Sequence, residues 1–171
     1  MGVLQMPGYG GGLPGGGWWR ARRRIDPRLF TDVMYLAKTI WAEARGEGRE
    51  GMRLVAWVIR NRVEAPEYPD TYPAVVTQPG QFSVWLRSDP NRDTMTDPLS
   101  GPDADDSAWY TALEVAWDVI HAAPSENPIP FVLHYVDVRL ERRLPAWAQG
   151  MEILRFPQAP RLIFLRAKKS K

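Results

Sequence analysis

The feature that most constrains this chain is an amphipathic segment that ends at glycine. Apolar side chains recur at helical spacing along one face of it, at Val33, Leu36, Ala37, Ile40, Trp41 and Ala44. Gly46 and Gly48 follow directly, and glycine is a common stop signal for a helix. Asp26-Pro27 is typical of a helix start, with proline at the first helical position. The segment therefore predicts a helix over residues 27–45 that buries one face in a core.

Two acidic residues stand near the end of this helix. Glu43 and Glu47 are four positions apart, so on a continuous helix they share a face. Two like charges at this spacing repel by a few tenths of a kcal/mol. At least one of the two glutamates is therefore present for a reason other than helix stability, or the positive charge of Arg45 or Arg49 offsets the repulsion. On spacing alone, a solvated helix end remains the competing interpretation.

The rest of the chain predicts an α+β fold that is mainly helical. Apolar periodicity indicates helices over residues 50–63 and 107–122, and residues 72–77 form a short helix or a turn. Between them, a long loop is interrupted by prolines. Runs rich in β-branched and aromatic residues predict strands at 131–136, 152–156 and 162–165. Because Pro157 and Pro160 lie between the last two runs, we expect a short C-terminal β-hairpin or sheet.

Composition narrows the classes of site and partner. The chain has 171 residues, 44% of them hydrophobic, which fits one domain that buries a core and carries an arm. A net charge of +2 does not argue for nucleic acid. There is no cysteine and there are two histidines, so we expect no metal site and no cofactor. No run approaches the roughly 18 apolar residues of a membrane span, and the N-terminus does not look like a secretory signal.

The chain divides into an arm, a domain and a short tail. Residues 1–26 form a glycine-rich N-terminal arm in which Trp18-Trp19 precede four arginines. Aromatics beside arginines anchor either at a membrane interface or in a protein groove; alternatively, the two tryptophans pack back on the domain. We expect the domain over residues 27–167 and a basic tail at 168–171.

Several motifs in order resemble a known family. The run from Ala37 to Glu47 (AKTIWAEARGE) is similar to the signature of the SleB/CwlJ-type, spore-cortex-lytic cell wall hydrolases. The resemblance continues through Val55–Val63 (VAWVIRNRV) and Gln78–Trp85 (QPGQFSVW), and more weakly at His134-Tyr135 and Pro145–Ala148. It implies a small lysozyme-like or lytic-transglycosylase-like domain whose substrate is the glycan strand of peptidoglycan.

The resemblance also implies a catalytic acid. Glu43 matches the catalytic glutamate of the family. Cleavage of a glycosidic bond needs a carboxylic acid that protonates the leaving oxygen, and its pKa must be raised by a partly apolar site. Glu47 matches a second recurrent position, and we interpret it as a supporting residue that orients loop backbone or pairs with Arg45 or Arg62.

The product chemistry stays open at this stage. A hydrolase of the common type needs a second carboxylate, and the sequence singles none out. The candidates without distinguishing context are Asp70, Asp89, Asp93, Asp97 and Asp137. A single acid suffices if the muramic C6 hydroxyl attacks, as in lytic transglycosylases. The resemblance favours that reaction or a closely related muramidase, both acting on the MurNAc–GlcNAc bond.

Substrate-binding residues are expected in the loop after residue 80. Gln81 and Ser83 can hydrogen-bond N-acetyl or hydroxyl groups, and Phe82 or Trp85 can stack on a sugar face. Core packing is the alternative for these two aromatics. His134, Tyr135 and Trp147 match further family positions, with core roles again as the alternative.

Two rival roles and a location complete the expectations. We expect a phage virion component or an endolysin, held in the virion or the cytoplasm until release, with virion proteins contacted through residues 1–24. The first rival is a non-catalytic structural or assembly module that keeps the fold and binds glycan. The second is a module held at a membrane surface by Trp18, Trp19 and the arginines.

Overall fold

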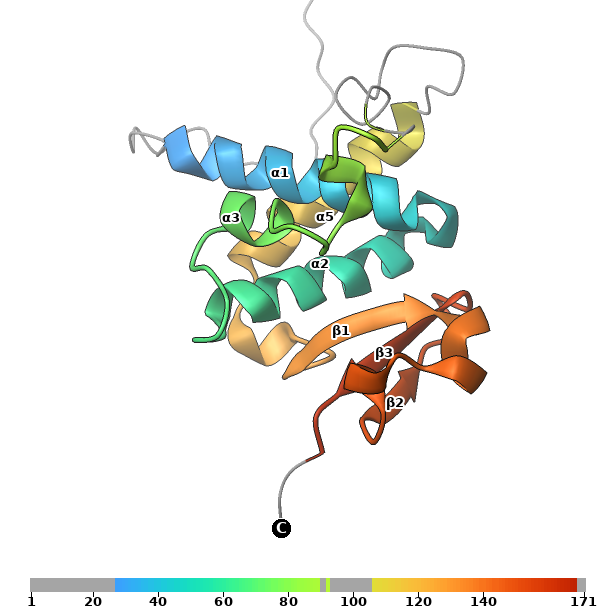
Figure 1. Ribbon diagram of the computed structural model, residues 1–171. Coiled ribbons are helices and arrows are strands. Elements are labelled where there is room, and N and C mark those ends of the chain that lie inside the picture. The colour runs from blue at the N-terminus through green and yellow to red at the C-terminus, as the bar shows by residue number, and fades with distance from the viewer. Residues whose placement is uncertain (1–26, 90–91, 93–105, 169–171) are drawn as a thin grey trace, which may run out of the picture.

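The computed structural model describes residues 27–89, 92 and 106–168 (Figure 1). Its helices and strands, in chain order, are α1 (Pro27–Ala44), η2 (Arg45–Glu47), α2 (Gly48–Glu64), α3 (Tyr72–Val76), η3 (Ser83–Trp85), α5 (Asp106–His121), η4 (Pro124–Glu126), β1 (Val132–Asp137), η5 (Val138–Arg143), η6 (Ala146–Ala148), β2 (Glu152–Arg155) and β3 (Leu162–Arg166). Helices thus dominate, and a small sheet follows them, so the predicted α+β class is confirmed.

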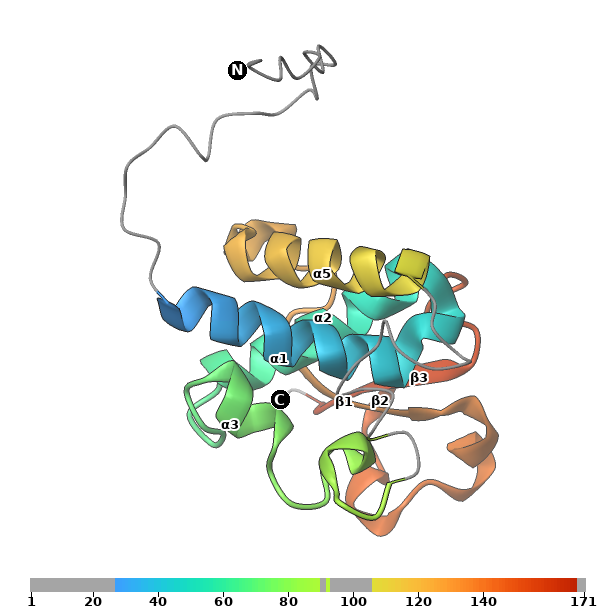
Figure 2. The same ribbon diagram turned by 90° about the horizontal axis from the view of Figure 1, so that it is seen from above.

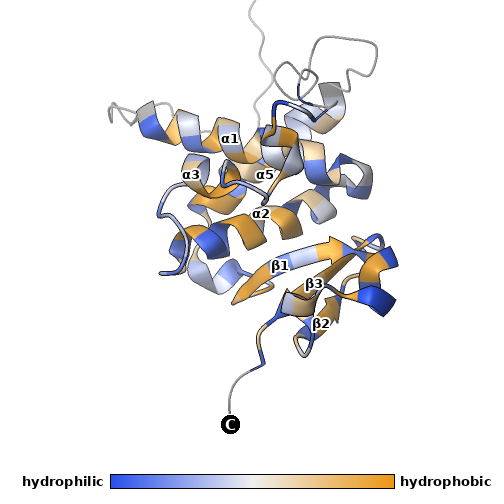
Figure 3. Cartoon of the chain, in the orientation of Figure 1, coloured by the Kyte–Doolittle hydropathy of each residue, from blue (hydrophilic) through white to orange (hydrophobic). Residues whose placement is uncertain are grey.

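Helix α2 is the centre of the molecule. Helices α1, α3 and α5 pack around one side of it, and β1 lies along another (Figures 1 and 2). Its side chains are buried almost all round, with Val55, Ala56, Val58 and Ile59 at 0% exposure. The apolar run Leu54–Ile59 in the middle of α2 is therefore enclosed by the elements packed around it. In Figure 3, α2 accordingly shows orange turns together with blue, hydrophilic ones.

Polar side chains at the end of α2 fix the elements that follow it. Arg60 donates to the carbonyl oxygens of Val119 (2.6 Å) and Ala122 (2.8 Å), which lie at the end of α5. The last carbonyls of a helix lack partners within the helix, so a buried arginine satisfies them. Asn61 donates to the carbonyl oxygens of Ile129 and Val132, both at 2.9 Å. The end of α2 therefore sets the position of β1.

The sheet has three antiparallel strands in the order β1-β3-β2. The central strand β3 carries the buried residues Ile163, Phe164 and Leu165, all at 0% exposure. Strands β2 and β3 are consecutive and form the predicted hairpin around Pro157 and Pro160. Strand β1 pairs with the other edge of β3, with Tyr135 opposite Phe164. It is therefore the strand that faces the helices.

Some sequence predictions need correction. Helix α1 ends at Ala44 rather than at residue 45, and α2 begins at Gly48 rather than at residue 50. Gly48 has a φ of +69°, which lets the chain reverse in only three residues. The third helix, predicted over residues 107–122, is α5 at Asp106–His121. The predicted arm at residues 1–26 lies outside the described residues.

No helix in the described ranges combines the length and the apolar character needed to cross a bilayer.

Candidate active site

The candidate site is built around Glu43, which lies in the last turn of α1. Its side chain is half-buried, whereas Ile40 and Trp41, which precede it on the same helix, are fully buried. Tyr135 in β1 donates its phenolic hydrogen to Oε2 of Glu43 at 2.8 Å. One helix end and one strand, 92 positions apart in sequence, thus meet at a single carboxyl group.

The surroundings favour the protonated form of Glu43. Burial raises the pKa of its carboxyl group above the ordinary 4.5, and the negative charge of Asp89 adds to the increase. The hydrogen bond from Tyr135 and the charge of Arg62 lower the same pKa without cancelling the effect of burial. Burial, together with Glu43, holds the pKa of the Tyr135 hydroxyl well above 10, so the hydroxyl remains a donor. This combination suits a carboxylic acid that delivers a proton.

Arg62 connects the parts of the site from within the protein. Its Nε donates to the carbonyl oxygen of Leu133 in β1 at 2.7 Å, and its Nη1 donates to Oε1 of Gln81 at 3.0 Å. The guanidinium also lies 5.4 Å from the ring centre of Tyr68 and 5.3 Å from that of Phe82. Burial lowers the pKa of Arg62. This residue therefore ties β1 to the loop that was predicted to bind substrate.

The sequence analysis missed this role for Arg62, which it proposed as a partner of Glu47. One signal was present: the three consecutive polar residues Arg60, Asn61 and Arg62 directly follow the apolar run Leu54–Ile59, and all three are buried. Buried polar side chains of this kind have hydrogen-bond partners that hold other segments in place.

The loop residues 81–85 divide into two groups. Phe82 is only 3% exposed and belongs to the core, so the core alternative holds for it and stacking on a sugar does not fit. Trp85 stacks on Tyr35 with ring centres 4.9 Å apart and donates from Nε1 to Oγ1 of Thr39 at 3.0 Å. Gln81 and Ser83 are exposed. The loop is thus anchored on α1, while two of its polar side chains face solvent.

His134 and Tyr135 are neighbours in sequence, but their side chains contact different residues. Tyr135 binds Glu43, whereas the ring of His134 lies against Trp147 with centres 4.9 Å apart. Alternation of side chains along a strand explains the difference. Burial and the charge of Arg62 lower the pKa of His134. Trp147 is 52% exposed, so it offers an open aromatic face.

Glu47 has a different environment from Glu43. Its side chain is only 5% exposed; Oε1 lies 3.1 Å from Nε of Arg161, and Oε2 accepts from the backbone N–H of Arg161 at 3.2 Å. The expected pairing with Arg45 or Arg62 is therefore wrong. Arg45 instead lies over the ring of Trp41 at 4.4 Å. The prediction that Glu47 orients loop backbone agrees with the contact to Arg161.

The structure also sorts the candidates for a second carboxylate. Asp70 is exposed, and Asp137 binds Arg139, which lowers the pKa of Asp137 to about 2. Asp93 and Asp97 lie outside the described residues. Asp89 is the candidate whose charge acts on Glu43. In the described ranges, no three acidic or histidine side chains gather closely enough to hold a metal ion.

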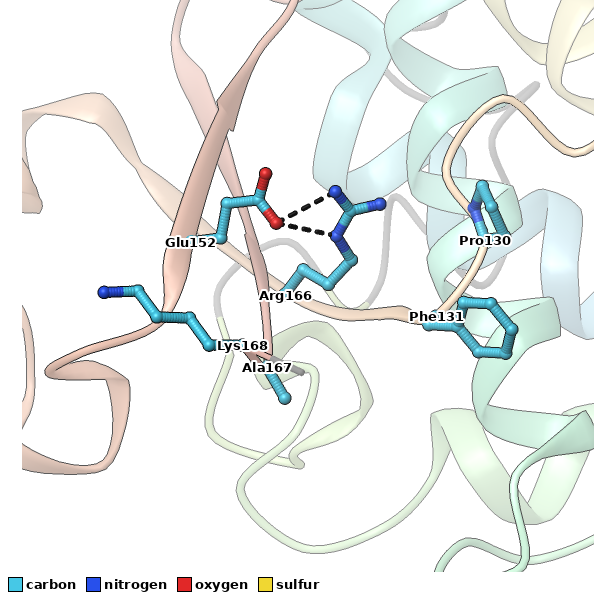
Figure 4. A pocket seen from close by; sticks show the side chains of 6 residues that line it. All are labelled: Pro130, Phe131, Glu152, Arg166, Ala167 and Lys168. Atoms are coloured by element: carbon cyan, nitrogen blue, oxygen red, sulfur yellow. Dashed lines mark hydrogen bonds and ion pairs between the residues drawn. The ribbon is translucent and has the colours of Figure 1, made fainter. Parts of the chain in front are cut away.

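Two cavities lie at other places in the fold. One of about 830 Å³ is bordered by Phe131 and by the ion pair between Glu152 and Arg166 (Figure 4). Another, of about 670 Å³, lies between α1 and α5. Glu43 lines neither of them. The chemistry around Glu43, rather than the size of a cavity, therefore marks the candidate site.

Comparison with known proteins places the chain in a family. The family described as Cell Wall Hydrolase matches residues 46–160. The chain belongs to this cell wall hydrolase family. The matched range contains Glu47, Arg62, Gln81 and Tyr135, whereas Glu43 lies three residues before it. The resemblance inferred from the sequence motifs is thereby confirmed.

Relatives within the family are known by name. The chain is 35% identical over 86 residues to a spore cortex-lytic enzyme of Oceanobacillus iheyensis, and 33% identical over 86 residues to one of Bacillus subtilis. Each match covers 46% of this chain, and 31% and 28% of the respective relative. The matched region therefore spans about a third of the length of these relatives.

Solved structures share the fold. The catalytic domain of the germination-specific lytic transglycosylase SleB from Bacillus anthracis superposes with a TM-score of 0.52 at 21% identity, covering 84% of this chain and 98% of that domain. The catalytic domain of Bacillus cereus SleB gives the same TM-score and identity, with 80% and 91% covered. The cell wall hydrolase described here thus has the fold of these domains.

Proposed function

We propose that this chain cleaves the glycan strand of peptidoglycan at the MurNAc–GlcNAc bond, with Glu43 as the general acid. The observation that carries the proposal is the environment of that carboxyl group. It is half-buried, its pKa is raised, and its hydrogen-bond partner is a neutral hydroxyl group rather than a cation. Spore cortex-lytic relatives in the same family support the choice of substrate.

The proton transfer follows from these contacts. In the proposed reaction, protonated Glu43 gives its proton to the glycosidic oxygen while positive charge builds at the anomeric carbon. The carboxylate that remains accepts the hydrogen bond from Tyr135 and feels the charge of Arg62. Both interactions favour the ionised form, so they stabilise the carboxylate of Glu43 after it has lost its proton.

Glu43 then acts as the base of the second half of the reaction. It removes a proton from the nucleophile that attacks the anomeric carbon. We favour the muramic C6 hydroxyl group as this nucleophile, which yields a 1,6-anhydro product. The protein with the same fold from Bacillus anthracis is named a lytic transglycosylase, and a single acid suffices for that reaction. If Asp89 positions a water molecule instead, the product has a reducing end.

Exposed side chains of the 81–85 loop and of η6 suit a sugar polymer. Gln81 and Ser83 offer hydrogen-bonding groups, and Trp147 offers an exposed aromatic face beside His134. Aromatic faces and a few polar groups are the usual means by which proteins hold carbohydrate. We therefore propose that the glycan strand passes between the 81–85 loop and the segment that carries Trp147. Delivery by a phage particle stays a prediction.

Digestion of purified peptidoglycan tests the proposal. Wild type and Glu43→Gln are incubated with the same preparation, and the released muropeptides are identified by mass spectrometry. Glu50→Gln serves as the matched control, because it makes the same change at a side chain that is 52% exposed. Anhydro-muramic ends from wild type and the control, but not from Glu43→Gln, are the expected result.

Other outcomes change the proposal in defined ways. Reducing ends from wild type alone would establish hydrolysis and turn attention to Asp89. Release by Glu43→Gln at the wild-type rate would remove Glu43 from the mechanism. Binding to the wall without release by any of the folded proteins would support the non-catalytic module instead.

A further inference from the structure

A second surface outside the candidate site lies between α1 and α5, two helices that run side by side (Figures 1 and 2). A cavity of about 670 Å³ opens there, and its apolar lining includes Phe30, Met34, Leu113 and Trp117. We call it the α1–α5 groove. Glu43 follows Met34 by nine residues, or about 14 Å at 1.5 Å per helical residue. The groove is therefore separate from the candidate active site.

The lining of the groove is unusually exposed for its residue types. Phe30 is 55% exposed, Met34 38% and Trp117 37%. On the same helix as Phe30 and Met34, the apolar residues Leu36, Ile40 and Trp41 are all at 0%. The second apolar stripe of α1 thus faces out of the core. Contiguous exposed apolar surface of this kind commonly marks an interaction site.

The rim of the groove is acidic. Glu114 and Asp118 on α5 both bind Arg49, at 2.7 and 3.0 Å. Their side chains are 67% and 61% exposed. Two carboxylates facing one guanidinium leave a net negative charge on the rim. The occupant that fits is therefore apolar and aromatic, with cationic groups beside the apolar part.

This chain carries such a segment shortly before α1 in sequence. Trp18-Trp19 are followed by Arg20 and by three consecutive arginines at residues 22–24. We propose that residues 18–24 dock into the α1–α5 groove of their own molecule. The tryptophans cover Phe30, Met34 and Trp117, and the arginines lie near Glu114 and Asp118.

The length of the connecting chain permits this docking. Pro27, where α1 begins, is eight residue steps after Trp19, and eight steps span at most about 26–29 Å. Phe30 lies one turn into α1, so the segment needs only to fold back over the start of the helix. A short tether gives an effective concentration in the millimolar range, so even a weak contact is populated.

Limited proteolysis of the full chain tests the docking. Trypsin cleaves after the arginines at 20–24, and mass spectrometry follows the appearance of the N-terminal fragments. Met34→Asp places a charge in the groove, and Leu140→Asp is the matched control at a residue that is 43% exposed on η5. We expect cleavage about tenfold faster in Met34→Asp than in wild type and in the control.

Equal rates in all three proteins would overturn the proposal. Protection that appears only at high protein concentration would also overturn it, because a second copy would then fill the groove. Amide chemical shifts of the full chain give a test that does not depend on Met34. Replacing Trp18 and Trp19 by alanine is expected to shift the amides around Phe30, Met34 and Trp117; changes confined to residues 16–26 would contradict the docking.

Discussion

Glu43 and Glu47 stand four residues apart, yet the two regions that hold them differ in almost every physical respect. Glu43, at the end of α1, is half-buried and accepts a hydrogen bond from the neutral hydroxyl of Tyr135. Glu47, in the turn η2, has a side chain that is 5% exposed and is bound to the guanidinium and backbone N–H of Arg161. Both join the helices to the sheet region, one through β1 and the other just before β3.

The difference shows that burial alone does not select a catalytic acid. The Glu47 side chain is also largely buried, at 5% exposure, but both its oxygens are engaged by Arg161. Glu43 has one strong partner that can remain bonded before and after a proton leaves. A carboxyl group with a neutral partner suits proton transfer, whereas one tied to a cation suits a structural tether.

The largest expected effect is on catalysis by Glu43→Gln. Loss of a general acid costs typically about 10²–10⁴-fold in rate. We expect this loss in the rate of muropeptide release from peptidoglycan, while circular dichroism and Tm remain close to wild type. A loss of less than about tenfold would mean that another group supplies the proton.

The next effect concerns the packing around Glu47. A methyl group at Gly51 would overlap Cβ of Glu47, so Gly51→Ala forces the turn and α2 apart. Overpacking of this kind costs about 1–3 kcal/mol, or roughly 5 °C in Tm for a domain of this size. Gly46→Ala is the matched control, because its new Cβ would meet only Arg161 at 3.5 Å. Thermal unfolding measures both; equal Tm values would contradict the close packing at Gly51.

A smaller effect is expected from Tyr135→Phe. The hydroxyl of Tyr135 lowers the pKa of Glu43, so its removal lets that pKa rise further. The variant should lose several-fold to about tenfold in kcat/KM, and the alkaline limb of its pH–rate profile should move to higher pH. Tyr110→Phe, at a side chain that is 57% exposed, is the control. An unchanged profile in Tyr135→Phe would show that the hydrogen bond to Glu43 does not matter for the reaction.

The smallest effect is on stability as a function of pH. The pKa of Glu43 is raised above 4.5 in the folded chain. At pH values below 4.5 the residue is protonated in both the folded and the unfolded chain, so it does not lower the free energy of unfolding there. As the pH rises above this value, the unfolded chain loses the proton first, and stability falls until the folded pKa has been passed. Glu43→Gln removes this loss of stability. We therefore expect no gain in Tm at pH 4 and a gain of about 1–3 °C near neutral pH; a gain of the same size at both values would contradict the raised pKa.

Much of the helical half could be predicted from the sequence. The apolar periodicity correctly predicted α1, α2 and α5, because each of these helices buries an apolar face against the others. The ends shifted by one or two residues where Gly48 takes a positive φ. The sheet was predicted by its β-branched runs, although its order, with β3 in the centre, depends on pairing that local patterns do not contain.

The candidate site was predictable only in part. Glu43 was found through the family resemblance, and Tyr135 was named without its contact. The partner of Glu47 was wrong because Arg161 lies 114 positions away and reaches it only through the folded sheet. Phe82 was ambiguous because an aromatic residue in a loop can face either way, and here Arg62 and the core enclose it. Long-range contacts of this kind leave little trace in local sequence.

The most direct test of the account is a parallel digestion of one peptidoglycan preparation by Glu43→Gln and Glu47→Gln, at a temperature where both are fully folded. The account predicts that Glu47→Gln keeps a rate within a few-fold of wild type and has the lower Tm of the two variants. It predicts that Glu43→Gln is folded and inactive. The reverse result, an inactive but folded Glu47→Gln beside an active Glu43→Gln, would contradict the assignment of the two glutamates.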